Sequence, residues 1–327
     1  MEVKAMKQAI TLKGATLKDA TLKDTTPKDT TLKDTTLKEA ESCIYEKVYF
    51  ALWEMGQRYS EFVQFRVIGR SHDDRMIPMF EIGKGERCIF CVSGLEGGDG
   101  ELPQYLLRAA KEYCQFYECG WIMGENYEVK KLLDRVKICF VPIVNPDAYE
   151  IAAYGYGAIR NPIYRQMLKM QDRPTEGFPC NARGIELKQN FPTNYYQRQK
   201  IHQEPASENE TRALIGIFQE YKSAGLLTFG YSHGKIIYSR QEKGFAYNQR
   251  NYRLARYLQK CSGYRLEKGK TASGGLGSKG NNPDMGSPEQ FYAEVIRQPS
   301  LAIEIPVSHR DIMKEIRQLP LEYIYSL

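Results

Sequence analysis

Residues 136–147 read VKICFVPIVNPD, an almost uninterrupted apolar run that stops at the turn-forming residues Asn145, Pro146 and Asp147. A short apolar run bounded by a turn is typical of a strand that is covered on both faces. Such strands occur in sheets with helices on each side, because only there are both faces removed from water. This stretch therefore predicts a central sheet inside an α/β domain.

The segments on either side alternate between strand-like and helix-like patterns. Strands are expected where short apolar runs lie between glycines and charges, at 63–68, 77–82, 88–92, 226–231, 236–238 and 301–305. Helices are expected where apolar residues recur at helical spacing, at 45–59, 102–117, 208–223 and 248–261. Ser207 is expected to cap the third helix, with Glu210 as its return partner. The predicted fold class is α/β, with a mixed central sheet and helices on both faces.

Length and composition indicate a folded globular protein and argue against a nucleic-acid-binding or transmembrane protein. The chain has 327 residues, of which 42% are apolar, enough for a large packed core. The net charge of +6 is spread along the sequence without a basic and aromatic cluster, so nucleic acid is not an expected partner. No apolar run is long enough to span a bilayer, and the N-terminus lacks the apolar core of a signal peptide. We therefore expect a cytoplasmic protein without a transmembrane segment.

Three of the eight cysteines, Cys88, Cys91 and Cys139, lie inside apolar strand-like runs. Cys88 and Cys91 have the spacing of a redox or metal pair, but strand residues three apart point to opposite faces of a sheet. We expect all three to be reduced thiols in the core.

Residues 11–40 consist of six five-residue units close to Thr-Leu-Lys-Asp-Thr. A period of five matches neither a helix nor a strand, and six units offer too few apolar groups for a core of their own. The sequence therefore predicts a low-complexity, disordered tail at residues 1–42 and one folded domain at residues 43–327.

Several stretches of the folded part resemble, in order, the zinc carboxypeptidases. They are 68–71 with 75–78 and 82–85, 88–94, 141–147, 181–187 with 190–192, 207–214, and 299–304. The style is closest to the family's bacterial gamma-D-glutamyl-L-diamino acid endopeptidases, which cleave peptidoglycan peptides. The resemblance implies the zinc carboxypeptidase fold across residues 43–327.

The resemblance also implies a zinc site made by a His-x-x-Glu pair, a distant His and a catalytic Glu. The positions that match the three ligands are Glu96, Asp99 and Tyr231, and the general-base position is Glu304. A two-residue slip of the strand would bring His233 to the place of Tyr231. A site without imidazole would gather three anionic groups on one dication, so no working zinc is expected. Zinc is the expected cofactor only if the family activity is retained.

The family's substrate-binding Asn-Arg pair corresponds to Lys188 and Gln189, and Arg183 begins the same segment. If Glu96, Asp99 and Glu304 meet in one cleft, their charges need a compensating cation. We predict that the Lys188 ammonium group bridges at least one of these carboxylates, with Arg183 as the second candidate. The Tyr231 hydroxyl is expected to donate to another carboxylate of the cleft.

The expected function is that of a degenerate peptidase with little or no metal-dependent hydrolysis, whose cleft binds peptides or peptidoglycan fragments. Two alternatives remain open: an active metallopeptidase with an oxygen-rich zinc site, and a structural or interaction protein tethered through its tail. His72, His202 and His309 lie in polar stretches and are expected to face solvent.

Overall fold

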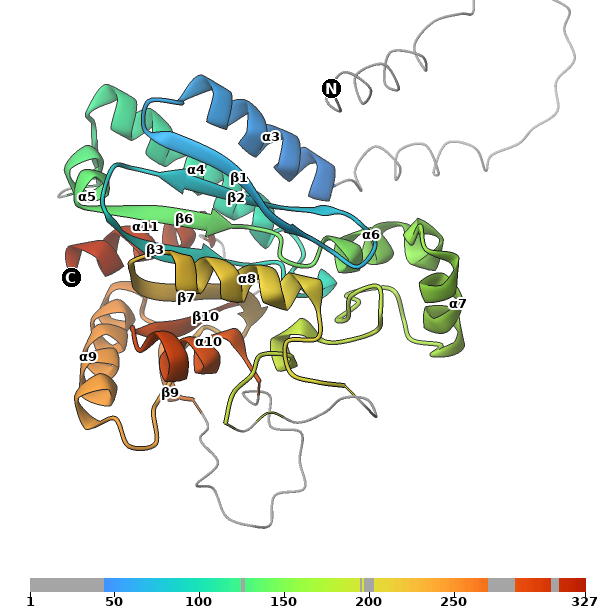
Figure 1. The fold of residues 1–327 in the computed structure, drawn as a ribbon. Helices are drawn as coiled ribbons and strands as arrows, with labels where there is room; N and C mark the ends of the chain where they lie inside the picture. Colours follow the sequence, from blue (N-terminus) through green and yellow to red (C-terminus); the bar gives the residue numbers. More distant parts are fainter. Residues whose placement is uncertain (1–43, 125–126, 195, 197–202, 270–285, 307–311) are drawn as a thin grey trace, which may run out of the picture. The chain divides into compact units, whose positions relative to one another are not determined.

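The structure is a computed structural model that describes residues 44–124, 127–194, 196, 203–269, 286–306 and 312–327 (Figure 1). An eight-stranded mixed sheet forms its centre, in the order β1-β2-β6-β3-β7-β10-β8-β9. The strands are β1 (Val63–Arg70), β2 (Met76–Ile82), β3 (Arg87–Val92), β6 (Val136–Val141), β7 (Ser223–Ser232), β8 (Lys235–Tyr238), β9 (Arg265–Lys268) and β10 (Ser300–Pro306). The four central strands, β6, β3, β7 and β10, are parallel. The predicted mixed sheet is confirmed.

Helices cover both faces of this sheet (Figure 1). One face packs against α3 (Ile44–Arg58), α4 (Leu102–Cys119), α5 (Val129–Arg135), α9 (Phe245–Ser262) and α11 (Ile312–Tyr325). The other face packs against α8 (Asn209–Glu220) and α10 (Pro288–Phe291). A short ribbon of β4 (Ile122–Met123) and β5 (Tyr127–Glu128) pairs separately. The predicted α/β class is therefore confirmed.

The cysteines of β3 show why its apolar run is continuous. Cys88 belongs to the core under α8, whereas Cys91 belongs to the core under α3 and α4. Their side chains thus leave the strand on opposite faces, as the period of two requires. Cys88, Cys91 and Cys139 are buried and outside any disulfide, as expected.

The predicted cap of α8 is wrong. The helix begins at Asn209 with Glu208 as the N-cap residue, and no side chain caps it. Ser207 precedes the N-cap residue, and its hydroxyl oxygen accepts from Asn190 Nδ2 at 3.1 Å while its proton is donated to Glu208 Oε1 at 2.6 Å. The low-complexity tail at 1–42, together with His202 and His309, lies outside the described residues.

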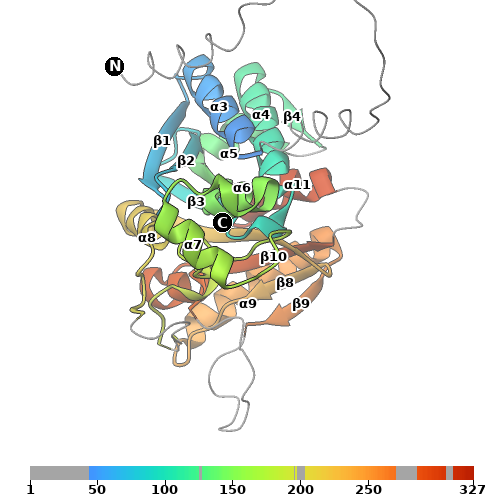
Figure 2. The ribbon, with the colours of Figure 1, turned by 90° about the vertical axis from the view of Figure 1, so that its right-hand side faces the viewer.

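Two further helices, α6 (Pro146–Tyr154) and α7 (Pro162–Met170), lie beyond the carboxyl ends of the parallel strands and face the viewer in Figure 2. The start of α6 is joined to the loop after β3. The Asn145 amide donates to Leu95 O at 3.0 Å, and the Asn145 N–H donates to Gly94 O at 2.8 Å. These bonds fix the position of the loop that carries Glu96 and Asp99.

Gly94 allows this close approach, and its replacement provides a test of the loop. Its φ is +66°, and a Cβ would lie 2.7 Å from Pro142 O. We predict that Gly94→Ala lowers the free energy of unfolding by about 1–3 kcal/mol, because both the backbone conformation and the contact become strained. Urea denaturation measures the change. Gly157→Ala, at a site with no atom within 4 Å of the added Cβ, is the control and should shift the midpoint little.

Candidate functional site

A cleft with a volume of about 470 Å³ lies at the carboxyl ends of β7 and β10. Its walls include Glu96, Lys188, Gln189, Tyr231 and Glu304, so the structure brings together five of the seven predicted site residues. Asp99 lies immediately behind them, within ion-pair distance of Lys188. The parallel strands cause this convergence, because their carboxyl ends meet at one edge of the sheet.

Lys188 is the cation at the centre of this cleft. Its Nζ lies 2.6 Å from Glu96 Oε1 and 3.7 Å from Asp99 Oδ1, and its side chain is 36% exposed. The predicted ion pair with a cleft carboxylate is therefore confirmed for Glu96. Burial alone would lower the pKa of Lys188, but the charges of Asp99 and Glu96 outweigh it and raise that pKa, so the ammonium group stays charged.

Asp99 is buried and turned towards its own loop. Its Oδ2 accepts the backbone N–H of Leu95 at 3.0 Å, while Oδ1 faces Lys188. Burial raises the pKa of Asp99 to about 6, although Lys188 opposes this shift. At pH 7 the Asp99 carboxyl group that faces the lysine is therefore largely ionised.

Glu304 reaches the same place from the neighbouring strand. It is half-buried on β10, and its register partner on β7 is Gly230. A Cβ added to Gly230 would lie 3.5 Å from Asp99 Oδ1 and 3.7 Å from Lys188 Nζ. Both are ordinary van der Waals distances, so position 230 lies directly beside the ion pair.

Tyr231, the residue predicted for the third ligand position, lines the cleft, whereas His233 is not among the lining residues. Tyr231 is in β7 opposite Ile305, whereas His233 is exposed in the turn that follows the strand. Which of the two residues corresponds to the family's ligand stays a prediction. Among the described residues the Tyr231 hydroxyl makes no hydrogen bond, so the prediction that it donates to a cleft carboxylate is wrong. Burial raises the pKa of Tyr231 to about 12, so the hydroxyl remains protonated.

The sequence analysis missed Glu289, which also lines the cleft. Glu289 is half-buried on α10 and accepts a hydrogen bond from the Thr228 hydroxyl of β7. Partial burial raises its pKa. In the sequence, a glutamate two residues after Ser287 is typical of the first turn of a helix. No local pattern indicates that this glutamate faces a cleft.

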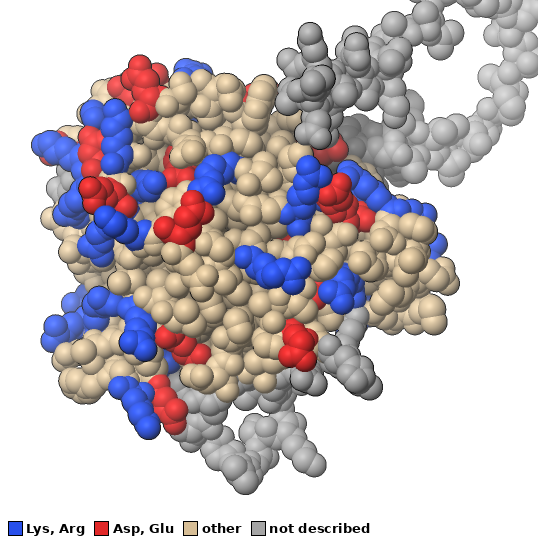
Figure 3. Space-filling model, viewed as in Figure 1, with Lys and Arg blue, Asp and Glu red and all other residues tan. Residues whose placement is uncertain are grey.

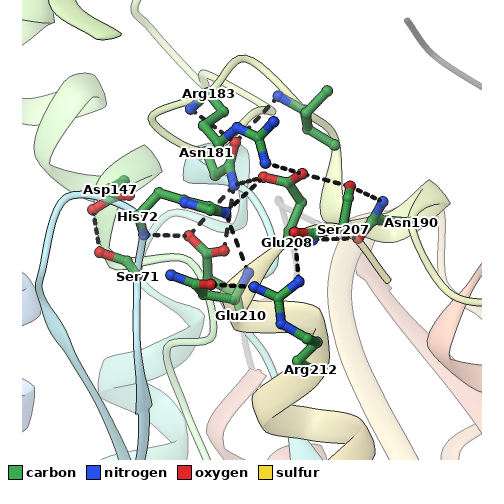
Figure 4. Close-up of polar contacts among 12 residues, drawn as sticks. Ser71, His72, Asp147, Asn181, Arg183, Asn190, Ser207, Glu208, Glu210 and Arg212 are labelled. Carbon is green, nitrogen blue, oxygen red and sulfur yellow. Dashed lines mark hydrogen bonds and ion pairs between the residues drawn. The ribbon is translucent and has the colours of Figure 1, made fainter. Parts of the chain in front are cut away.

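Arg183 lies outside the cleft walls, in a polar network at the start of α8 (Figure 4). Its Nη1 lies 3.2 Å from Glu208 Oε1, and Asn181 Nδ2 donates to Glu208 Oε2 at 2.7 Å. The same amide lies 3.3 Å from Glu210 Oε2. A role for Arg183 in ligand binding stays a prediction, because its observed partner is Glu208.

His72 belongs to this network, so its assignment as a solvent-facing imidazole is wrong. Its side chain is only 13% exposed, and Nε2 lies 3.2 Å from Glu208 Oε2. Its backbone N–H donates to Glu210 Oε1 at 3.3 Å. The partners are 136 and 138 positions away in sequence, which is why local polarity gave the wrong answer.

The two glutamates of the network have opposite protonation states. Burial would raise the pKa of Glu208, but hydrogen bonds from His72, Ser207 and Asn181 outweigh it and lower that pKa to about 2. Burial and the nearby Asp147 carboxylate raise the pKa of Glu210 to about 8. The network therefore holds one carboxylate and one carboxylic acid at pH 7.

This network does not fit a metal ion, although ligand atoms of His72, Glu208 and Glu210 lie within 4.8 Å of one another. The oxygens of Glu208 already accept hydrogen bonds, the Arg183 guanidinium lies beside them, and Glu210 is protonated. Its structural effect is to join the start of α8 to the segment that begins at Asn181 and continues to Lys188. The network thus helps to position the cleft lysine.

Comparisons with known proteins give the same fold. A family model described as zinc carboxypeptidase matches residues 48–294. The carboxypeptidase N catalytic chain of Rattus norvegicus is 23% identical over 217 residues, which cover 59% of this chain and 42% of that protein. The match thus spans less than half of that relative. Within the described residues, no helix combines the length and apolarity needed to cross a bilayer.

Solved structures agree with the family match at the level of the fold. The structure of thrombin activatable fibrinolysis inhibitor aligns with a TM-score of 0.63 at 15% identity, covering 86% of this chain and 73% of that one. The metallo-carboxypeptidase of Burkholderia cenocepacia aligns with a TM-score of 0.58 at 12% identity, covering 86% and 67%. At such identities the likeness concerns the fold and not the activity.

The raised pKa of Glu210 predicts a pH dependence of stability. Between its ordinary value of 4.5 and about 8, the folded chain keeps a proton that the unfolded chain has released. Stability from this group therefore falls as the pH rises through that window, by up to about 1.4 kcal/mol per pH unit. Gln does not titrate, so Glu210→Gln should remove this slope in urea denaturation between pH 5 and pH 8.

The control for this measurement is Glu86→Gln, because the Glu86 side chain is 85% exposed. Its stability should follow that of the wild type at every pH. An unchanged slope in Glu210→Gln would show that Glu210 is ionised in the folded protein.

Proposed function

Because the chain belongs to the zinc carboxypeptidase family, we propose that it is a degenerate member in which the Lys188 ammonium group takes the place of the zinc ion. Its cleft binds peptides or peptidoglycan fragments without metal-dependent hydrolysis. The observation that carries this proposal is the distance of 2.6 Å between Lys188 Nζ and Glu96 Oε1. The ammonium group supplies the positive charge that clustered carboxylates require.

The residues at the three ligand positions do not fit zinc. Glu96, Asp99 and Tyr231 offer no imidazole, and Tyr231 would have to lose a proton whose pKa is about 12. Asp99 already uses Oδ2 to accept a backbone N–H. A dication beside both carboxylates would also be repelled by the ammonium group of Lys188, which the same carboxylates attract. Metal-dependent hydrolysis is therefore not part of the proposed function.

The charges of the cleft favour a ligand that carries an amine. Its walls carry more carboxylates than ammonium groups: Glu96, Glu186, Glu267, Glu289 and Glu304 against Lys188, Lys235 and Lys268. Lys188 pairs with Glu96, and Lys235 pairs with Glu267 at 3.0 Å. Among the described residues Glu304 forms no ion pair, although Lys235 lies opposite it on β8, so we assign the binding of the ligand's cation to Glu304. A peptide with a basic side chain and a muropeptide with a diamino acid both present such a group.

Zinc binding provides the first test. Isothermal titration of the metal-free wild type with zinc should show no stoichiometric binding near neutral pH. The triple variant Glu96→His/Asp99→Glu/Tyr231→His should bind zinc, because it provides two imidazoles and a longer carboxylate. Adding Lys188→Asn to it should strengthen binding by about tenfold or more, because the competing ammonium group is removed.

Two outcomes would contradict this proposal. If the wild type binds one zinc per chain and then releases C-terminal residues or muropeptide fragments, the protein is an active metallopeptidase with an oxygen-rich site. If all variants fail to bind zinc, Glu96, Asp99 and Tyr231 are not at the metal position of the fold.

Peptide binding provides the second test. Two tetrapeptides that differ only in a lysine or a norleucine side chain are titrated into the protein. We expect the lysine peptide to bind more tightly, and Glu304→Gln to weaken that binding by about tenfold through the loss of one charge. Glu176→Gln, an exposed change outside the cleft walls, is the control. Binding of neither peptide would favour the structural or interaction role, which pull-downs with and without residues 1–40 would examine.

A further inference from the structure

A second cavity, with a volume of about 840 Å³, opens at the other end of the parallel strands. Its walls include Arg87, Ala224 and Pro299, which lie where β3, β7 and β10 begin. The cleft with Lys188 lies where β7 and β10 end, at Tyr231 and Glu304. The two cavities are therefore separate sites at opposite edges of one sheet.

Three arginines, Arg87, Arg250 and Arg253, give this cavity its charge. Arg250 and Arg253 are three positions apart on α9, so they lie on the same helix face. Arg87, at the start of β3, lines the same cavity from the edge of the sheet. Figure 3 shows Lys and Arg side chains at the lower left, in the region of α9, with Asp and Glu side chains beside them.

These arginines have no carboxylate partner within the described part of the chain. The cavity walls contain no Asp or Glu side chain. Arg250 Nη2 donates to the Arg297 carbonyl at 3.0 Å, which fixes its position without neutralising its charge. By contrast, Arg66, Arg75 and Arg317 each form an ion pair with a carboxylate. Three exposed arginines that line one cavity therefore give it a positive charge that an anion can meet.

The remaining walls of the cavity are largely apolar and aromatic. They include Leu254, Tyr257, Pro299, Tyr325 and Leu327. Small-molecule sites typically combine such walls with a few polar groups that orient the ligand, in volumes of about 300–1,000 Å³. An inorganic anion would bind the arginines but leave the apolar walls exposed to water. An organic anion would bind the arginines and also cover the apolar walls.

We propose that this cavity binds a small organic phosphate. Arg250 and Arg253 bind its phosphoryl group, Arg87 adds charge from the strand side, and the organic part packs against Tyr257 and Leu254. The planar fork of a guanidinium group matches two phosphoryl oxygens, and three such groups match a dianion. The ligand class follows from the arginines and the apolar walls together.

The test uses phenyl phosphate as the probe and isothermal titration of the full chain. We expect saturable binding with a Kd below about 1 mM and at least tenfold weaker binding to Arg250→Gln/Arg253→Gln. Arg253→Gln alone should also weaken binding, and it removes no hydrogen bond to the backbone, so a folding defect does not confuse the result. Arg256→Gln, an exposed arginine of α9 outside the cavity walls, is the matched control and should bind as the wild type does.

Two further probes separate the sources of affinity. Inorganic phosphate should bind at least tenfold more weakly than phenyl phosphate, and benzyl alcohol should not bind measurably. The proposal is overturned by a lack of saturable phenyl phosphate binding, by equal affinity for inorganic phosphate, or by an equal loss in Arg256→Gln. None of these outcomes depends on whether the cleft at Lys188 binds peptides.

Discussion

The ion pair between Lys188 and the carboxylates of Glu96 and Asp99 is the interaction on which the account of this cleft depends. Two acidic side chains, which the sequence analysis assigns to metal-ligand positions, meet at the carboxyl edge of a parallel sheet. Without a cation, one of them would take up a proton. The ammonium group of Lys188 instead lies 2.6 Å from Glu96 Oε1 and offsets part of the negative charge.

Other parts of the fold bring the members of this pair together. The loop of Glu96 and Asp99 is bonded to the start of α6 through Gly94 and Asn145. The segment of Lys188 begins at Asn181, whose amide is bonded to the glutamates before and within α8. A shift of either segment would separate the Lys188 ammonium group from the carboxylates. The ion pair therefore depends on the correct position of both segments at the carboxyl edge of the sheet.

The sequence predicted those features that depend on local patterns or on charge balance. The buried strands followed from apolar runs such as the one at Val136–Val141. The partner of Glu96, 92 positions away, followed from the family resemblance, which implies that the segment of Lys188 borders the same cleft, and from the need of clustered carboxylates for a cation. The sequence could not predict the environment of His72, whose partners come from distant segments, or the recruitment of the Ser207 hydroxyl by Glu208. Hydrogen bonds between remote side chains have no signature in a local pattern.

Whether the ammonium group truly takes the place of the metal is tested most directly by a crystal structure of the wild type grown in excess zinc. The anomalous signal at the zinc absorption edge would be mapped around Glu96, Asp99 and Tyr231. The account predicts no anomalous peak there and a Lys188 Nζ that remains in contact with the Glu96 carboxylate. A zinc peak bound by these three side chains, with Lys188 turned away from them, would contradict it.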